Sequence, residues 1–562
     1  MRREVSVVNK KVCSFPILFA LLALLIGTCA VVFPASAQAA PTSTGSITVS
    51  GTVASSYDAY QIFSANVVDG DSDAKIATDL AWASDAARDA VLPVLHSAGM
   101  SNSQTTAQEA VEWLNTDSHL TSALSAQLAR SLQSSDAESV ALNAGTTAEL
   151  SCGYWLIVAD DDAIAQNEAG TAPIMALVGG SAVTVKPKAA TPKVSKHVLE
   201  DSTAAWQKAA DATVADDLYW RLSATVPAGL TAYDTYTVQF VDTMSAGLDP
   251  SKVVASMRVY VAAGADGGFD AVSADKDGRA GTEPAKGWTD ITAQCATKVA
   301  PDGTFTVRTG DLIAALGGAD AFTAGARVVA VYNAPLNSAC NHGIAKGNPN
   351  EVYLRYPRSP FADQSGDAGF THTPSDDACA YTWDLALTKR GSDGDKPLAG
   401  AVLSIADDRG RTLAADGTWD AEGKATVTTG EDGRVAVSGV DSGKLEVREF
   451  KAPKGYTAFE GTRSVTVKAE GLDVDQVAAA KPKLTITAES PLRADSADGS
   501  TGSLEASLIN TPTGTPPSIT TGGFMPSTGD MAMYAAAAAA VAGAALIVVA
   551  LLVKRGGGSH TE

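Results

Sequence analysis

The chain has 562 residues, which leaves room for about three or four domains with cores of their own. Its formal net charge of −21 argues against nucleic acid and against an anionic membrane face as partners, because phosphate binding needs clustered Lys and Arg. Only 6% of the residues are aromatic while Gly numbers 50, so we predict a mainly β protein of sandwich modules joined by polar turns.

The chain begins with a basic segment followed by an apolar stretch from Phe15 to Phe33. Small residues after this stretch offer two A-x-A cleavage points, after Ala37 and after Ala39. This order is typical of a secretory signal peptide, and we assign residues 1–39 to it. The mature protein is therefore expected outside the cytoplasm, where disulfides persist.

Four cysteines remain after removal of the signal peptide, and we regard them all as disulfide candidates: Cys152, Cys295, Cys340 and Cys379. The sequence does not choose among their pairings. It has no C-x-x-C motif and its six His are scattered, so we predict no metal site and no cofactor.

Residues 40–190 show a mixed pattern that predicts an α+β or decorated sandwich domain. Four segments have the β-branched, alternating character of strands, and three have apolar residues at helical spacing. The predicted strands are Ser46–Val53, Tyr57–Val67, Gly153–Val158 and Ile174–Val185, and the predicted helices are Ala81–Leu95, Thr106–Leu114 and Leu120–Leu132.

This first domain ends in the segment Val183-Thr184-Val185-Lys186-Pro187-Lys188. Pro187 removes a ladder donor and ends the strand, so the next side chain, that of Lys188, projects from a domain edge toward solvent. An enzyme can reach such an amine. The plain alternative is a solvated Lys pair in an interdomain hinge.

Residues 191–378 form a second predicted sandwich, with alternating strands at Leu218–Val226, Tyr233–Val241, Arg327–Asn333 and Glu351–Tyr356. The Gly- and Asp-rich segment from Ala262 to Gly287 is typical of an exposed loop insertion.

Two strands of this second module place a charged residue in an apolar row. Lys196 shares a strand face with Val194 and Val198, and Asp242 shares one with Phe240 and its neighbours at alternating positions. A buried Lys beside a buried carboxylate usually means an ion pair.

Residues 379–511 form a third predicted sandwich, in which three apolar strand rows each end in one polar residue. The three polar residues are Lys389, Glu449 and Asn510. A solvated strand end explains any one of these rows, but the three residue types together fit chance poorly.

Residues 512–523 form a Pro/Thr/Gly-rich spacer, and residues 524–562 contain an apolar run from Tyr534 to Val553 that is followed by Lys554-Arg555. The run is long enough to span a bilayer as a helix, with the basic pair at its inner edge. A permanent single-pass anchor is the plain interpretation.

The five residues before this run resemble the L-P-x-T-G cell-wall sorting signal of Gram-positive surface proteins, with Met where that family usually has Leu: Met525, Pro526, Ser527, Thr528 and Gly529. The resemblance implies that a sortase cleaves between Thr528 and Gly529 and passes the Thr carbonyl to an amine. The membrane helix would then be a transient anchor.

Other strings resemble backbone pilins of Gram-positive bacteria, namely Tyr60-Gln61-Ile62-Phe63, Gly153-Tyr154-Trp155-Leu156 and the end of the first domain, which is similar to the pilin motif V-x-V-Y-P-K. In that motif the last Lys is the nucleophile of polymerisation. The resemblance implies Lys188 in this role, with Lys186, which stands where the family usually has Tyr, as the fallback.

Residues 445–456, Leu-Glu-Val-Arg-Glu-Phe-Lys-Ala-Pro-Lys-Gly-Tyr, resemble the E-box of CNA-B type domains. Sandwich domains of this immunoglobulin-like, CNA type carry self-generated isopeptide bonds. In the third module the resemblance implies Lys389 as nucleophile, Asn510 as acyl donor and Glu449 as proton shuttle.

In the second module the family's Asn slot is occupied by Arg358, on the row of Val352, Leu354 and Tyr356. Arg cannot be acylated in this way and stays charged. We therefore favour a charge cluster of Lys196, Asp242 and Arg358 over a bond that uses another Asn, such as Asn350.

Together these resemblances imply a major pilin subunit on the surface of a Gram-positive bacterium, joined from Thr528 of one copy to Lys188 of the next. The implied partners are other copies of the chain, pilin and housekeeping sortases, ancillary pilins, peptidoglycan and a host surface ligand. The alternatives are a monomeric wall-anchored adhesin and an ancillary pilin. No G-x-S-x-G, H-E-x-x-H or P-loop occurs, so an enzyme is not predicted.

Overall fold

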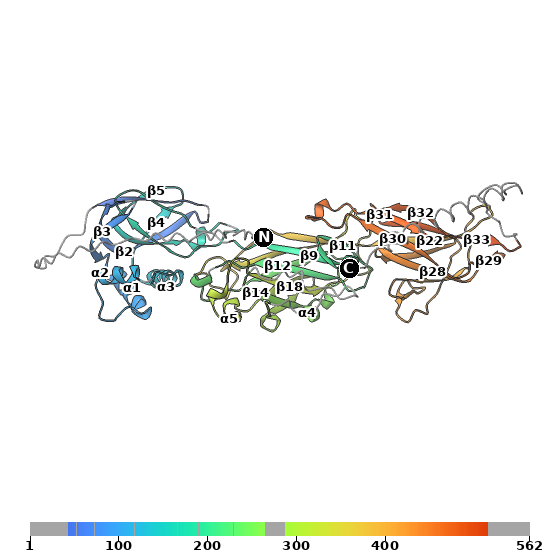
Figure 1. Ribbon diagram of the computed structural model, residues 1–562, viewed down its shortest axis with the longest axis horizontal. Helices are drawn as coiled ribbons and strands as arrows, with labels where there is room; N and C mark the ends of the chain where they lie inside the picture. Colours follow the sequence, from blue (N-terminus) through green and yellow to red (C-terminus); the bar gives the residue numbers. More distant parts are fainter. Residues whose placement is uncertain are drawn as a thin grey trace, which may run out of the picture.

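The computed structural model describes residues 43–514, apart from 52, 72–73, 117, 166, 188–190, 229 and 265–286. Three β modules follow one another in chain order along the long axis of the molecule, each built from two sheets (Figure 1). The longer helices all belong to the first module. The predicted fold class, mainly β with tandem sandwiches and an N-terminal α+β domain, is confirmed.

The N-terminal module has a hydrophobic cluster between its two sheets and a second one between the larger sheet and the helices. The smaller sheet has the order β5 (Thr147–Ser151), β1 (Thr44–Val49), β8 (Val183–Val185). The larger sheet has the order β3 (Lys75–Trp82), β2 (Ser56–Asp69), β6 (Gly153–Ala159), β7 (Ile174–Val178), and β4 (Ser139–Asn143) also pairs with β2.

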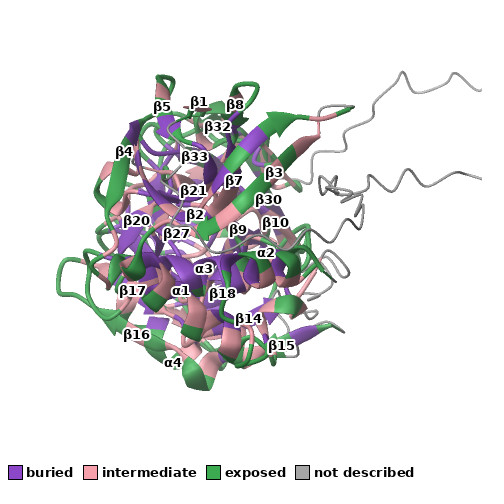
Figure 2. Ribbon diagram, turned by 90° about the vertical axis from the view of Figure 1, so that its left-hand side faces the viewer, coloured by how far each residue is buried: buried purple, intermediate pink, exposed green. Residues whose placement is uncertain are grey.

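The helices of this module are α1 (Asp85–Ser97), α2 (Ala107–Asn115) and α3 (Ser122–Gln133), close to the predicted ranges. Each begins at a side-chain cap, and α2 has a full capping box between Thr106 and Glu109. Buried residues of α1 and α3 pack with residues of β2 and β6 in one hydrophobic cluster. Viewed from this end of the molecule, the helices lie on one side of the larger sheet (Figure 2).

The segment predicted as one strand, Ile174–Val185, is two strands in different sheets. β7 pairs with β6, whereas β8 pairs in parallel with β1. The break falls at Gly179 and Gly180, whose φ values are +125° and +63°. A Cβ on Gly179 would lie 2.6 Å from Cβ of Val67, so only Gly fits where the chain changes sheets.

The middle module encloses the largest hydrophobic cluster between two sheets. The first sheet has the order β10 (Ala205–Gln207), β9 (Val194–Glu200), β12 (Tyr219–Thr225), β18 (Arg327–Asn333), β14 (Arg258–Ala262), β15 (Trp288–Asp290). The second has the order β11 (Ala209–Asp211), β21 (Asp376–Tyr381), β19 (Asn348–Pro357), β13 (Gln239–Met244), β17 (Thr304–Arg308), β16 (Ala296–Val299), and β20 (Phe370–His372) pairs with β19. Two short helices, α4 (Val253–Ser256) and α5 (Leu312–Ala315), complete it.

The predicted strand Tyr233–Val241 begins too early. Side chains, rather than a neighbouring strand, accept the backbone N–H groups at its start: Asp311 Oδ1 accepts from Tyr236 at 2.9 Å, and Thr309 Oγ1 accepts from Val238 at 3.0 Å. The ladder of β13 therefore begins at Gln239. Most of the predicted loop insertion, residues 265–286, lies outside the described residues.

The third module is also a sandwich. One sheet has the order β27 (Arg434–Val440), β22 (Trp383–Gly391), β33 (Ser503–Pro512), β29 (Tyr456–Thr457), and β32 (Leu492–Asp498) also pairs with β33. The other has the order β25 (Trp419–Asp420), β24 (Thr412–Leu413), β23 (Val402–Ala406), β28 (Gly443–Lys451), β30 (Thr462–Glu470), β31 (Lys483–Ala488), and β26 (Val427–Thr428) pairs with β23.

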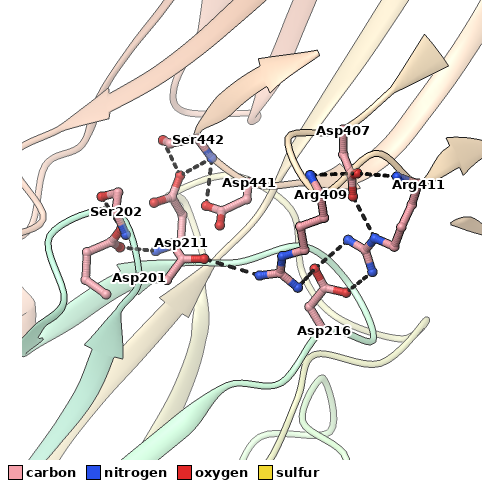
Figure 3. A network of polar contacts seen from close by, with 10 residues as sticks. Asp201, Ser202, Asp211, Asp216, Asp407, Arg409, Arg411, Asp441 and Ser442 are labelled. Atoms are coloured by element: carbon pink, nitrogen blue, oxygen red, sulfur yellow. Dashed lines mark hydrogen bonds and ion pairs between the residues drawn. The ribbon is translucent and has the colours of Figure 1, made fainter. Parts of the chain in front are cut away.

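A polar network joins the middle and third modules (Figure 3). Asp216 of the middle module accepts hydrogen bonds from the guanidinium groups of Arg409 and Arg411 in the third. Asp211 Oδ2 accepts from the indole N–H of Trp383 at 2.5 Å and from the backbone N–H of Ser442 at 2.9 Å. These contacts tie the two modules together at several points, so we expect them to move as a unit.

The same junction contains carboxyl groups whose pKa values are raised by burial and by mutual repulsion. Burial, and next to it the charge of Asp211, raises the pKa of Glu200 to about 8. Burial also raises the pKa of Asp441 well above its ordinary value, helped by Asp211, Asp201 and Glu200. Arg409 offsets only part of this repulsion, through its contact with Asp201.

We therefore expect the protein to lose stability as the pH rises from about 5 to 8. The native state keeps the Glu200 proton up to a pH of about 8 and the unfolded chain releases it near the ordinary Glu pKa, so the loss is on the order of 1 kcal/mol per pH unit. Chemical unfolding at pH 5.5 and 8.5 and fixed ionic strength measures it. Glu200→Gln should flatten the dependence of unfolding free energy on pH. The control Glu351→Gln, at an exposed position, should leave that dependence unchanged. A wild-type protein that is equally or more stable at pH 8.5 than at pH 5.5 would contradict this account.

Candidate functional site

The third module brings together the three polar residues that end its apolar rows. Strands β22 and β33 pair in parallel, with Lys389 opposite Leu508 and Gly391 opposite Asn510, so the ends of both strands meet at one end of the sheet. Glu449 comes from β28 in the facing sheet. All three side chains are buried, with exposed fractions of 0% for Lys389, 7% for Glu449 and 2% for Asn510.

Contacts within this group join a nucleophile, an acyl group and an acid. Lys389 Nζ donates a hydrogen bond to Asn510 Oδ1 and lies 3.5 Å from Glu449 Oε1. Asn510 Nδ2 donates to both carboxylate oxygens of Glu449, at 2.9 and 3.1 Å. Glu449 is fixed in turn by the backbone N–H of Phe459 at 3.1 Å. One carboxylate thus lies next to both the amine and the amide nitrogen.

Burial supplies the protonation state that amide transfer requires. Desolvation lowers the pKa of Lys389 to about 8, against the opposing effect of the Glu449 charge, so the neutral, nucleophilic amine is accessible near neutral pH. The geometry permits Nζ to form a bond with Cγ of Asn510 while Glu449 carries a proton from the amine to Nδ2. The Cγ–Nδ2 bond then breaks and ammonia leaves.

The middle module has a second buried group around Lys196 and Asp242, both fully buried. Lys196 on β9 donates from Nζ to Asp242 Oδ2 on β13, across the two sheets. Burial lowers the pKa of Lys196 to about 8 and raises the pKa of Asp242, so the environment disfavours charge on both partners.

The structure corrects the third member of this group. Arg358 follows the end of β19 at Pro357, and its Nη1 donates to the backbone oxygen of Asp161 in the first module at 3.3 Å. Asn350, at the start of the same buried row, contacts the cluster instead. The predicted charge cluster with Arg358 is therefore wrong. The N-terminal end of the β19 row, not its C-terminal end, lies next to Asp242, because in the β13–β19 ladder Asp242 lies opposite Val352 and Met244 opposite Asn350.

Sequence reasoning missed Tyr332 altogether. Its hydroxyl accepts hydrogen bonds from Lys196 Nζ at 2.9 Å and from Asn350 Nδ2 at 2.8 Å. The available signal was the alternation of Arg327–Asn333, a predicted strand in which Tyr332 falls on the apolar face.

The structure also corrects the disulfide prediction, since all four candidate cysteines are free thiols: Cys152, Cys295, Cys340 and Cys379. Cys152 packs in the first module, Cys295 and Cys340 pack on the core of the middle module, and Cys379 packs in the third. Separation in different cores explains why most of the pairs cannot form. Within the described part of the chain, no cluster of three or more His, Cys, Asp or Glu is arranged to hold a metal ion.

The groups predicted for intermolecular joining are only partly covered by the described residues. Lys186 is exposed directly after β8, and Pro187 follows it. Lys188, the sorting signal Met525–Gly529 and the apolar run Tyr534–Val553 lie outside the described residues. Within the described ranges, no helix combines the length and the apolar character needed to cross a bilayer.

Comparison with known proteins gives one curated relative and several solved structures. The chain is 29% identical over 143 residues to the trypsin-resistant surface T6 protein of Streptococcus pyogenes serotype M6, a match that spans 24% of each chain. The solved T6 backbone pilin of the same serotype is 17% identical, with a TM-score of 0.45, covering 84% of this chain and 98% of the other. The full-length major pilin SpaD of Corynebacterium diphtheriae is 14% identical, with a TM-score of 0.41, covering 84% and 100%.

One family matches part of the third module. Residues 384–481 match the SpaA family, described as a prealbumin-like fold domain. The matched segment includes strands β22 and β28, and with them Lys389 and Glu449. The third module is thus similar to the SpaA prealbumin-like fold domain.

Proposed function

We propose that the protein is a structural subunit of a covalently polymerised surface pilus, in which a pilin sortase joins Thr528 of one copy to Lys188 of the next. Each copy is then both acyl donor and acceptor, and such a head-to-tail contact does not close, so it grows a fibre. The similarity to a streptococcal surface protein and to the SpaA domain supports this proposal.

The observation that carries the proposal is the buried contact of Lys389, Glu449 and Asn510. These residues lie where an isopeptide bond would join the first and last strands of the third module, β22 and β33. A covalent joint between these strands suits a subunit that transmits tension along a fibre. Autocatalytic bond formation is a single self-modification, so the protein is not an enzyme acting on a substrate.

The remaining features fit a subunit exported and attached to the cell wall of a Gram-positive bacterium. The N-terminal signal peptide directs export, and the C-terminal segment holds the chain transiently in the membrane until a sortase acts. The partners are then other copies of the chain, pilin and housekeeping sortases, ancillary pilins, peptidoglycan and a host surface ligand for adhesion.

The middle module extends the proposal to a second bond, between Lys196 Nζ and Asn350 Cγ, with Asp242 as the acid. This bond would join β9 of one sheet to β19 of the other. Among the described residues, Asn350 Oδ1 and Asp242 Oδ1 are both buried without a hydrogen-bond partner, so neither oxygen is engaged in a contact that would oppose the reaction.

Intact mass of the secreted, reduced ectodomain tests both intramolecular bonds. We expect the chain to be lighter than its sequence by two molecules of ammonia. Asn350→Ala and Asn510→Ala should each restore one of them, after correction for the substitution. A wild-type mass equal to that of the unmodified sequence would contradict both bonds.

A further inference from the structure

Tyr332 lies at the centre of the Lys196 group. Its phenol oxygen is 2.9 Å from Lys196 Nζ, 2.8 Å from Asn350 Nδ2 and 3.1 Å from Asp242 Oδ2. All four side chains are buried, with exposed fractions of 0%. One hydroxyl therefore contacts the amine that would attack, the nitrogen that would leave and the acid.

Comparison with the third-module site shows which contact the Tyr332 hydroxyl supplies in the middle module. In the third module, Glu449 alone contacts both nitrogens, that of Lys389 and that of Asn510. In the middle module the acid is Asp242, which is shorter by one methylene. Among the described residues, Asp242 Oδ2 binds Lys196 and Tyr332, Asp242 Oδ1 binds no partner, and Asn350 Nδ2 donates to Tyr332. Tyr332 spans the gap between the shorter acid and the amide.

We propose that Tyr332 is a catalytic residue of the middle-module cross-linking reaction, whose phenol passes the proton from the attacking amine to the departing amide nitrogen. This inference rests on the proposed bond between Lys196 and Asn350. Nζ of Lys196 forms a bond with Cγ of Asn350 and gives up a proton to the phenol, directly or through Asp242 Oδ2. The phenol gives its own proton to Nδ2, the Cγ–Nδ2 bond breaks, and ammonia leaves with Tyr332 and Asp242 regenerated.

The surroundings of Tyr332 suit a neutral donor in a fixed position. Burial, and next to it the charge of Asp242, raises the pKa of Tyr332 well above its ordinary value, so the phenol keeps its proton. The ring packs edge-on against Phe305 at a centroid distance of 4.7 Å and lies under Lys196 Nζ at 5.4 Å. Because these ring contacts do not involve the hydroxyl, Tyr332→Phe removes the relay and keeps the packing.

The test compares full-length secreted chains that carry Tyr332→Phe or Tyr356→Phe with the wild type. Tyr356 is a matched control, because it is buried on the Asn350 row and its hydroxyl has no hydrogen-bond partner among the described residues. Peptide mapping at fixed times after expression measures the Lys196–Asn350 cross-link, and the Lys389–Asn510 cross-link serves as internal standard. We expect Tyr332→Phe to slow the first by about 100-fold, the lower end of what a positioned acid–base group contributes, and Tyr356→Phe to leave it unchanged.

A second variant separates lost chemistry from lost folding. In the double variant Tyr332→Phe, Asp242→Glu the longer carboxylate can reach both nitrogens, as Glu449 does, and renewed cross-linking supports the relay. A wild-type rate in Tyr332→Phe alone overturns the role of Tyr332 and leaves the bond itself intact. Absence of the cross-link from the wild-type chain overturns the bond, and the role of Tyr332 with it.

Discussion

Replacing Glu449 with Gln is expected to leave the third module without its cross-link and the ectodomain heavier by one ammonia. Gln cannot carry the proton from Lys389 to Asn510 Nδ2, although it fills the same space. The lost bond would close a chain segment with a separation of 121 residues. By the loop-closure estimate for a cross-link across a segment of that order, its loss lowers the free energy of unfolding by about 4 to 5 kcal/mol. Intact mass and denaturant unfolding measure the two effects.

Glu446→Gln is the matched control for this substitution. Glu446 lies on the same strand, β28, but on its exposed face, where it pairs with Lys444. We expect the control to keep the wild-type mass and nearly the wild-type stability, because an exposed ion pair contributes little. If the Glu449→Gln chain loses the same ammonia as the wild type, Glu449 is not the proton carrier.

Replacing Lys188 with Ala is expected to collapse the covalent polymer to single subunits. The Lys amine is the acceptor of the Thr528 acyl group in the proposed reaction, and Ala offers no nucleophile. On denaturing gels of cell-wall extracts, the high-mass ladder of the wild type should shrink to the monomer band. The effect should be all or none, because each joint needs this one amine.

Two further substitutions, Lys193→Ala and Lys186→Ala, serve as comparisons for Lys188→Ala. Lys193 is an exposed lysine at the other side of the same linker, and its loss should leave the ladder unchanged. Loss of the ladder in Lys186→Ala, with Lys188→Ala unaffected, would transfer the acceptor role to the exposed Lys186. A ladder that survives all three substitutions would favour a monomeric wall-anchored adhesin over a polymerising subunit.

The three polar residues of the third-module site could be predicted from the sequence because strand geometry is local. Every second residue of a strand faces the same way, so Lys389, Glu449 and Asn510 could be assigned to buried rows without knowing the sheet order. Their convergence on one point depends on the parallel pairing of β22 with β33 and on the facing sheet, which local pattern does not contain.

The middle-module site shows where this reasoning fails. The sequence pattern predicts the buried row of Val352, Leu354 and Tyr356, but this row can be extended toward Asn350 or toward Arg358. Only the pairing of β19 with β13 shows that the Asn350 end lies next to Asp242. Tyr332 reaches the site from a strand that is separated from β9 by β12 in the sheet order. Contacts between residues this far apart in sequence follow from topology, not from spacing.

Two other features, the close approach of backbone segments and the electrostatics between modules, also could not be predicted from the sequence. Gly179 and Gly180 split a predicted strand because the chain crosses between two sheets there, and the mostly apolar residues on either side have the pattern of one continuous strand. Glu200 and Asp211 both belong to the middle module, whereas Asp441 belongs to the third, so this group of carboxyl groups is complete only at the junction of the two modules.

The central claim is a covalent joint between neighbouring subunits, and sequencing of peptides from digested fibres tests it most directly. Fibres released from the cell wall and cut by protease should yield a branched peptide in which the carbonyl of Thr528 is bonded to Nζ of Lys188. Recovery of this peptide at high yield is the predicted result. Fibres that give only unbranched peptides from both regions would contradict the account.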